Sequence, residues 1–338
     1  MRVSGYISGA LVAIVVTVAA LSCSKFSYHE PQYEESYVHV EVDGDSEIPC
    51  RIMMSRLVNA CHYVWEVDTL ARPVGLGEYY AVAYRADDQY EITNENEFAN
   101  DPSVSMQDVY AVLPPDKENY GRISDFNPYS SFISPADGLL EFDFKKVSVA
   151  DTATYVTFSP KSLTQDITFR LKVKAGQGVT VEKVSAAISG VPSKVRLLSG
   201  MLRNDAQNPT FRLFMNMTQV NGSDMYEGSI SVLGLFPPLS SQHTTGPGIF
   251  QVALQAVVAK DGKDYERVFY AAINLKSVIE KAGLMEQTED MTGYRIRKSE
   301  AIIEIPVVLQ VSADKVIPGD GEGLEQWFEN DADIEVEV

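Results

Sequence analysis

The chain has 338 residues, of which 45% are hydrophobic, and this content excludes disorder as its global state. Its 28 basic and 47 acidic side chains give a formal net charge of -19, so neither a nucleic-acid partner nor an anionic lipid surface has electrostatic support. The length is too great for one β-sandwich and suits two domains.

The first 22 residues have the layout of a secretory signal peptide. Arg2 precedes an apolar run over residues 9–21, and the small residue Ser22 follows. The run is too short to cross a bilayer, which takes about 20 apolar residues, and the residues after it are polar. We therefore expect residues 1–22 to be removed.

The end of the signal carries a second pattern, because Ala20-Leu21-Ser22-Cys23 resembles the lipobox of bacterial lipoproteins with Ala20 and Leu21 exchanged. The resemblance implies that Cys23 becomes the mature N-terminus and carries diacylglycerol and an amide-linked acyl chain such as palmitate. Two or more acyl chains anchor a protein stably where one does not. The alternative is an ordinary signal peptide in which Cys23 is incidental. In either case residues 23–36 form a polar tether.

Two cysteines remain for the folded body, Cys50 and Cys61. They form a disulfide or stay as two free thiols, since an oxidising compartment permits the bridge and a domain of this size does not need it. A Cys50 nucleophile with His62 as its base is disfavoured, because no third group that would orient the base is recognisable.

Residues 37–158 are predicted to form a first β-sandwich. Val38, Val40 and Val42 alternate with polar residues, which is typical of a half-buried strand, and this places His39 on the solvated face. Residues 91–127 are rich in Asn, Asp, Pro and Gly and are expected to be mostly irregular connections. The aromatic side chains in and just after this stretch are expected to cover the end of the sandwich; they are Tyr120, Phe126, Tyr129 and Phe132. Further strands are expected near residues 48–56 and over 63–67, 79–84, 108–113, 139–144 and 153–158.

Residues 159–338 are predicted to form a second β-sandwich. An Asp261-Gly262 pair between two apolar runs predicts a hairpin, and Gly283 ends a short predicted helix over residues 276–283. A turn is expected over residues 189–192, and Pro306 indicates an edge or a bulge. Strands are expected over 166–174, 179–188, 195–198, 211–217, 225–233, 249–259, 267–273, 301–305 and 307–311.

The last eight residues alternate between acidic and apolar side chains. A segment with this pattern gains enough to offset its ordering entropy only when it docks on a sheet, so we expect a strand at or near an edge of the second sandwich. This terminal segment, residues 331–338, is the candidate for β-strand addition. Its apolar face consists of Ala332, Ile334, Val336 and Val338.

Signatures of catalysis and metal binding are missing from the sequence. It has four histidines and contains no H-E-x-x-H, G-x-S-x-G, P-loop or G-x-G-x-x-G motif. The acid spacing over residues 43–47 fits a turn better than a calcium loop, since the rest of an EF-hand pattern is absent. We therefore expect no catalytic residues, no metal and no cofactor.

Residues 162–173, residues 184–192 and Trp327 together resemble the recurring pattern of the fimbrillin-like lipoproteins of Bacteroidales, in particular the anchor subunits of their type V pili. The resemblance implies an all-β fold of two transthyretin-like β-sandwich domains in tandem, with short helical insertions. It also implies an outer-membrane protein, held by lipid and without a catalytic role, that acts in pilus assembly or adhesion.

Polymerising members of the family are cleaved after arginine, and here the relevant Arg72 precedes Pro73, a poor protease substrate. The resemblance therefore implies an anchor or base subunit, with membrane lipid at Cys23, pilus subunits and host or bacterial surface ligands as partners. Surface display and retention on the periplasmic leaflet stay open, because no acid follows Cys23 before Glu30. The alternative function is a glycan-binding surface lipoprotein of a polysaccharide-uptake system, which the presence of only two tryptophans, Trp65 and Trp327, disfavours.

Overall fold

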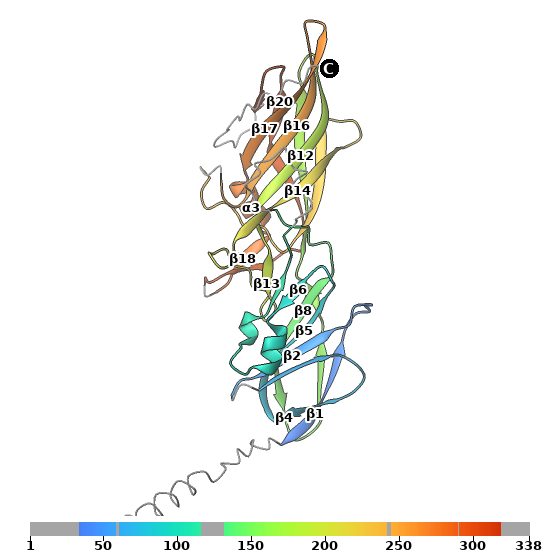
Figure 1. Ribbon diagram of the computed structural model, residues 1–338, viewed down its shortest axis with the longest axis vertical. Coiled ribbons are helices and arrows are strands. Elements are labelled where there is room, and N and C mark those ends of the chain that lie inside the picture. Colours follow the sequence, from blue (N-terminus) through green and yellow to red (C-terminus); the bar gives the residue numbers. More distant parts are fainter. Residues whose placement is uncertain (1–33, 59–60, 116–131, 242–244, 290, 319–338) are drawn as a thin grey trace, which may run out of the picture.

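The computed structural model describes residues 34–58, 61–115, 132–241, 245–289 and 291–318. The regular secondary structure of this part of the chain is almost wholly β-strand, with two short α-helices and one 3-10 helix. The molecule is elongated, with the first strands at one end and the strands of the C-terminal half at the other (Figure 1). The expectation of an all-β fold with short helical insertions is confirmed.

The N-terminal half consists of two facing sheets. Their strands are β1 (Glu35–Val42), β2 (Arg51–Arg56), β3 (His62–Glu66), β4 (Arg72–Gly75), β5 (Gly77–Ala86), β8 (Leu140–Val149), β9 (Thr154–Phe158) and β10 (Lys161–Ser162). One sheet has the order β4-β1-β9 and the other β10-β8-β5-β2-β3. The alternation in β1 buries Val38 against Tyr79 and Phe158 between the sheets, while His39 faces outward and stacks on Tyr155 at 4.5 Å.

The C-terminal half has one eight-stranded sheet in the order β17-β16-β12-β14-β15-β11-β20-β21. The strands are β11 (Gln165–Ala175), β12 (Val179–Pro192), β14 (Thr210–Gln219), β15 (Met225–Val232), β16 (Ile249–Lys260), β17 (Lys263–Asn274), β20 (Glu300–Val311) and β21 (Val316–Pro318). β14 and β15 pair only through Thr218 and Gln219. The sheet therefore folds over on itself into a sandwich.

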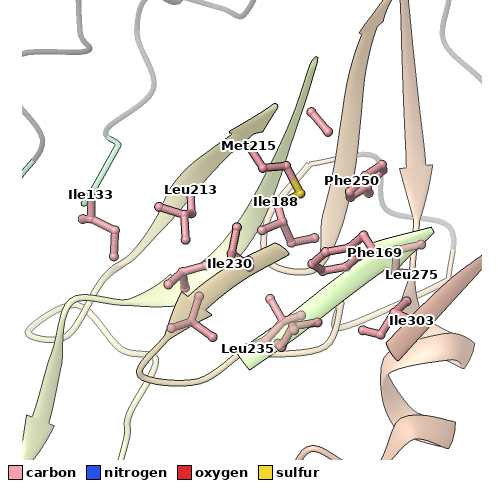
Figure 2. Close-up of a cluster of buried hydrophobic side chains, with 14 of the residues drawn as sticks. Ile133, Phe169, Ile188, Leu213, Met215, Ile230, Leu235, Phe250, Leu275 and Ile303 are labelled. Carbon is pink, nitrogen blue, oxygen red and sulfur yellow. The ribbon is translucent and has the colours of Figure 1, made fainter. Parts of the chain in front are cut away.

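The two layers of this sandwich meet in a continuous apolar core (Figure 2). The ring of Phe169 on β11 stacks on that of Phe250 on β16 with their centroids 5.2 Å apart. Ile188, Leu213 and Ile303, which come from three other strands, are also almost fully buried. Burial of one such side chain contributes about 1.5–3 kcal/mol, so this alternation of apolar residues is the main source of stability in the C-terminal half.

The two halves are joined by backbone pairing as well as by side chains. β6 (Glu91–Thr93) and β7 (Tyr110–Val112) of the first half form a small sheet with β13 (Lys194–Arg196) of the second. Farther along, the N–H of Ile133 donates to the carbonyl of Arg212 on β14, and the N–H of Ala136 donates to Ser231 on β15. Residues 132–136 thus bridge the two strands at which the eight-stranded sheet splits.

Local sequence predicts one helix and one hairpin of the structure correctly, but not the second helix. Helix α3 (Lys276–Ala282) ends at Gly283, whose φ of 61° is the left-handed conformation that glycine adopts at little cost. The predicted Asp261-Gly262 hairpin joins β16 to β17, with both turn residues at positive φ. Helix α2 (Glu95–Asn100), by contrast, lies inside a stretch that was expected to be irregular.

The turn expected over residues 189–192 is wrong, because β12 continues through these residues to Pro192. The glycine lies in a bulge, where the register with β14 shifts between Ser189 and Val191 and Gly190 takes a φ of 91°, and Pro192 is the last residue of the strand. Pro306 likewise lies within one continuous strand, β20, and the pairing register with β11 shifts across it. The bulge expected at Pro306 is therefore confirmed.

Candidate functional site

Most residues that the sequence singles out lie outside the described residues. Cys23, Trp327 and the terminal segment, residues 331–338, all fall in this category. The lipid anchor and the terminal strand therefore stay predictions. In the remainder of the chain, which the structure does describe, no helix is both long and apolar enough to cross a membrane.

The disulfide considered between Cys50 and Cys61 is contradicted by the pairing of β2 with β3. The N–H of Val67 donates to the Cys50 carbonyl at one end of this strand pair, and the N–H of Arg56 donates to the Cys61 carbonyl at the other. The length of β2 between them is about 20 Å, whereas a disulfide needs Cα atoms within about 7 Å. Both cysteines are free thiols, and Cys50 is buried.

The same register separates Cys50 from His62, which pairs with Ser55 at the far end of β2. The His62 ring packs on the ring of Phe98, and its Nδ1 lies 2.9 Å from the Phe98 carbonyl oxygen. His62 therefore helps to hold helix α2 against β3. Burial raises the pKa of the Cys50 thiol to about 11, which keeps it protonated and unreactive at neutral pH. The disfavoured nucleophile–base pair is therefore not formed.

One side of the C-terminal sandwich carries two sheet edges, and we refer to it as the open side. β17 has β16 as its only strand neighbour among the described residues. β20 is paired on this side only through Leu309, Gln310 and Val311, which contact β21. The two edges lie close together, since the Arg267 guanidinium of β17 donates to the Ala313 carbonyl in the turn between β20 and β21 at 3.1 Å.

The two edges of the open side differ in how well they can accept a further strand. β20 contains Pro306, which lacks an N–H, and a bulge, and both features limit regular pairing. β17 has twelve residues, no proline and an unbroken register with β16. Its first half is charged, whereas Val268, Phe269, Ala271 and Ile273 make its second half apolar. β17 therefore offers the more regular edge.

A cavity of about 680 Å³ lies where the two halves meet, and we refer to it as the junction cavity. Its walls come from three places in the chain: the 3-10 helix η1 (Met106–Asp108), the segment after β13, and the hairpin of β18 (Met285–Gln287) and β19 (Tyr294–Ile296). The lining residues are Gln107, Arg196, Leu198, Ser199, Met201, Glu286, Gln287, Thr288, Glu289, Thr292 and Arg295.

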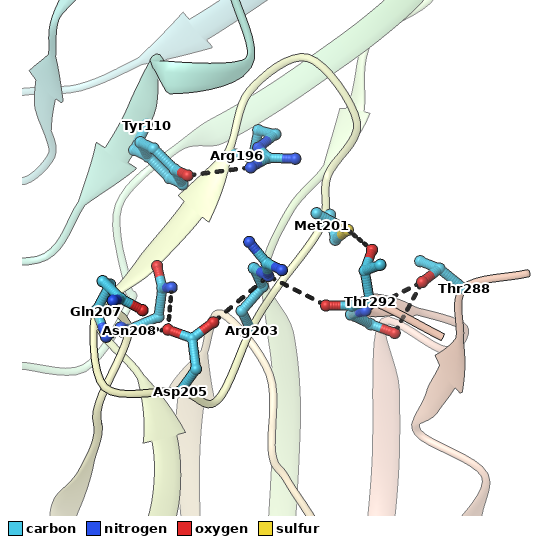
Figure 3. Close-up of polar contacts among 10 residues, drawn as sticks. Tyr110, Arg196, Met201, Arg203, Asp205, Gln207, Asn208, Thr288 and Thr292 are labelled. Atoms are coloured by element: carbon cyan, nitrogen blue, oxygen red, sulfur yellow. Dashed lines mark hydrogen bonds and ion pairs between the residues drawn. The ribbon is translucent and has the colours of Figure 1, made fainter. Parts of the chain in front are cut away.

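Hydrogen bonds fix the surroundings of the junction cavity (Figure 3). Nη2 of Arg196 donates to the Tyr110 hydroxyl at 3.2 Å, and its guanidinium lies over the Tyr110 ring. Nε of Arg203 donates to the Thr292 carbonyl at 3.1 Å and pairs with Asp205 at 3.5 Å. The Asn208 amide donates to Asp205, and this bond lowers the pKa of the Asp205 carboxyl.

Two polar atoms in the cavity wall are left without a partner. Arg196 Nε and Ser199 Oγ are both buried, and neither makes a hydrogen bond to the described protein atoms. A buried polar atom without a partner costs about 1–3 kcal/mol, so such atoms often mark a place where water or a ligand binds. The sequence could not indicate this site, because its walls lie almost 200 residues apart and share no motif.

Among the described residues, no group of three or more His, Cys, Asp or Glu side chains could hold a metal ion. The aromatic residue Phe132, which was expected to cover the end of a sandwich, is 4% exposed and packs on the outer face of β12 and β16 against Ala187 and Ala253.

Comparison with known proteins gives a fold relationship. No family model matches the chain, and no curated protein matches it. Among solved structures, it is similar to a candidate adhesin from Bacteroides ovatus, with 13% identity, a TM-score of 0.51 and coverage of 86% of this chain and 96% of that one. A second candidate adhesin from Bacteroides ovatus shows 10% identity, a TM-score of 0.46 and coverage of 92% and 96%.

The tip fimbrial protein Mfa3 from Porphyromonas gingivalis, solved with a C-terminal truncation, shows 9% identity, a TM-score of 0.39 and coverage of 88% and 99%. At these identities the likeness concerns the fold alone, and the TM-scores of the second and third structures are too low to support an argument. The chain therefore shares the fold of a Bacteroides candidate adhesin, which confirms at the level of the fold its resemblance to the fimbrillin-like proteins of Bacteroidales.

Proposed function

We propose that this protein is a lipid-anchored fimbrial subunit of the outer membrane, of the anchor or base kind, and that an adjoining subunit joins it by β-strand addition at the open side. The observation that carries the proposal is the edge of β17, twelve residues long and with one strand neighbour among those described. The fold shared with a Bacteroides ovatus candidate adhesin supports a role in adhesion or fimbriae in general.

Strand addition suits this edge for a physical reason. A strand that pairs with β17 gains main-chain hydrogen bonds along its length, and the alternate apolar side chains of the added strand decide which partner fits. Long apolar edges are otherwise a liability, because they pair with any exposed strand. The charged residues of the first half of β17, such as Asp264 and Glu266, limit such unwanted pairing, whereas the second half is apolar.

In this proposal the terminal segment, residues 331–338, is a second added strand at the open side, besides the strand of the adjoining subunit. The described chain leaves the sandwich at β21, next to both edges of the open side. The twelve residues between β21 and this segment, 319–330, would span about 40 Å when extended, which is enough to reach any part of the open side. The segment's alternating apolar and acidic residues suit a strand that pairs along one edge and faces water on its other side.

The anchor in this proposal is Cys23. Lipid on this residue would hold the chain at the outer membrane, and the tether up to residue 36 would let the body stand away from it. Replacement of Cys23 by serine should move the protein from the membrane fraction to the soluble fraction. A Cys23→Ser protein that stays in the membrane at high salt would contradict lipid anchoring.

A pair of double variants tests the terminal segment. Ile334→Asp with Val336→Asp puts charge on the apolar face, whereas Asp333→Asn with Glu335→Gln changes the opposite face and serves as the matched control. We expect the first variant to lose co-purification of fimbrial subunits at an unchanged melting temperature and the control to keep both. Loss of folding would indicate a purely structural strand, and full subunit attachment in both variants would contradict the role in assembly.

A glycan-binding role is the second candidate function. The junction cavity favours it, because polar side chains from distant parts of the chain converge on a hollow of a size that ligand sites commonly have. The two roles do not exclude each other in one protein, and their tests are independent.

A further inference from the structure

We propose that the junction cavity binds an uncharged, hydroxyl-rich saccharide of one or two sugar residues. This inference rests on the second candidate function, glycan binding, for which it names the class of ligand, and it uses residues that the open side does not share. The volume of about 680 Å³ falls in the range of small-ligand sites and leaves room for a ligand of this size.

The lining offers both kinds of hydrogen-bonding group that sugar hydroxyls need, since each hydroxyl donates one hydrogen bond and accepts others. Arg196 and Arg295 only donate, Glu286 and Glu289 only accept, and the amide side chain of Gln107 does both. The two guanidinium groups and two carboxylates also balance in charge. A simple anion would meet the carboxylates and a cation the arginines, so the lining favours a neutral ligand.

Most of this hydrogen-bonding capacity is unused by the protein. The side chains of Gln107, Glu286, Gln287, Glu289 and Arg295 make no hydrogen bond or ion pair among the described residues, although Glu286 and Arg295 are cross-strand neighbours. Deeper in the wall, Arg196 Nε and Ser199 Oγ are buried without a partner. Both atoms have almost no accessible surface, so the proposed ligand contacts the exposed polar groups of the lining and not these two.

The walls of the cavity are held in place before any ligand arrives. The Arg196 guanidinium is fixed on one side by the Tyr110 hydroxyl and ring. The β18–β19 hairpin is tied to the segment after β13 by the bridge between Leu202 and Tyr294 and by the bond from Arg203 to the Thr292 carbonyl. Such preorganisation lowers the entropy cost of binding.

The cavity also has an apolar portion, which sugar rings use through their C–H faces. Leu198 and Met201 line it, and the Thr292 hydroxyl donates to the Met201 sulfur at 3.6 Å and so helps to orient that side chain. Among the described lining residues no aromatic ring is present to stack on a sugar. We therefore expect modest affinity, in which hydrogen bonds to charged groups contribute most.

Binding of defined oligosaccharides to the purified full-length chain tests the proposal. The probes are fluorescent mono- and disaccharides of glucose, galactose, mannose and N-acetylglucosamine, with glucuronic acid and sialic acid as the charged comparison. The test variant is Glu286→Gln with Arg295→Gln, two exposed residues whose joint change leaves the net charge unaltered. Its matched control is Glu182→Gln with Lys174→Gln, an exposed acid and base on β12 and β11 that lie outside the cavity lining.

We expect at least one neutral probe to bind the wild-type chain, with affinity reduced about tenfold or more in the test variant and unchanged in the control. Binding of none of the neutral probes, preference for the acidic probes, or equal binding by the test and control variants would each overturn the proposal. None of these results bears on attachment of fimbrial subunits.

Discussion

At the scale of single residues, the position of the two thiols follows from strand register. Cys50 and Cys61 directly precede the neighbouring strands β2 and β3, and from the sequence alone a bridge and two free thiols are both compatible with their spacing. The pairing of β2 with β3 decides between them, because it places the two residues at opposite ends. Register depends on contacts with the rest of the sheet, so no local pattern could have settled it.

The two thiols should therefore differ in reactivity. In the folded protein at pH 8, a maleimide should label the half-buried Cys61 and leave Cys50 unlabelled, because Cys50 is buried and its pKa is raised to about 11. Mass spectrometry of the labelled, unreduced protein checks this. Both thiols should react after unfolding in guanidinium chloride, and an unreactive pair under those conditions would reveal a disulfide.

The raised pKa of Cys50 also predicts a direction for stability against pH. The ordinary thiol value is 9.0 and the folded value is about 11, so the unfolded state releases this proton at a lower pH than the native state. The contribution of the protonated thiol to the free energy of unfolding is fully present below pH 9 and is lost as pH rises toward 11. Replacement of Cys50 by alanine should flatten this part of the stability profile, and an unchanged slope would contradict the assignment.

A second prediction at this scale concerns Gly190, which forms the bulge in β12. A Cβ atom here would lie 2.8 Å from the Gly248 nitrogen and 2.9 Å from the Phe236 carbonyl oxygen, and φ is 91°. Gly190→Ala should therefore destabilise the protein by about 2–4 kcal/mol in urea unfolding. Gly222→Ala is the control, since that residue has a φ of 67° and open space around it, and it should cost about 1 kcal/mol.

At the scale of elements, periodicity was a sound guide to strands and a poor one to short helices. The perfect alternation in β11 and the Asp261-Gly262 pair between β16 and β17 predicted the observed strands and hairpin. Helix α2 could not be predicted from periodicity, because it has only six residues, a single buried side chain, Phe98, and no side-chain cap at Asn94. An element of this size is fixed by its tertiary contacts, here with His62 on β3.

Residues 132–136 connect the first half to the second sandwich through backbone hydrogen bonds and a buried side chain. Ile133 is 2% exposed in the main core, and its N–H donates to the Arg212 carbonyl. Ile133→Ala should lower the free energy of unfolding by about 2–5 kcal/mol. The same substitution at Ile302, which is 57% exposed on β20, should change it by about 0.5 kcal/mol or less, and equal effects would contradict this packing.

At the scale of the whole molecule, the sequence predicted two sandwiches in series, and the structure shows how closely they are connected. One apolar core includes Tyr84 of the first half and Phe169 of the second, and β7 pairs with β13 between them. Neither the shared core nor the junction cavity could be predicted, because both depend on pairing between segments far apart in the chain. The domain boundary at residue 159 stays a prediction. β10, which lies just beyond it, pairs with β8 of the first half.

The central claim is that an adjoining subunit joins this chain along the edge of β17, and site-specific photo-crosslinking in fimbriated cells tests it most directly. A photoreactive residue at the exposed Glu266 on β17 should form a covalent adduct with another fimbrial subunit. The same residue at the exposed Lys172 should form none, because β11 is flanked by β15 and β20. Fimbriae that assemble without an adduct at Glu266, or with equal adducts at both positions, would contradict the claim.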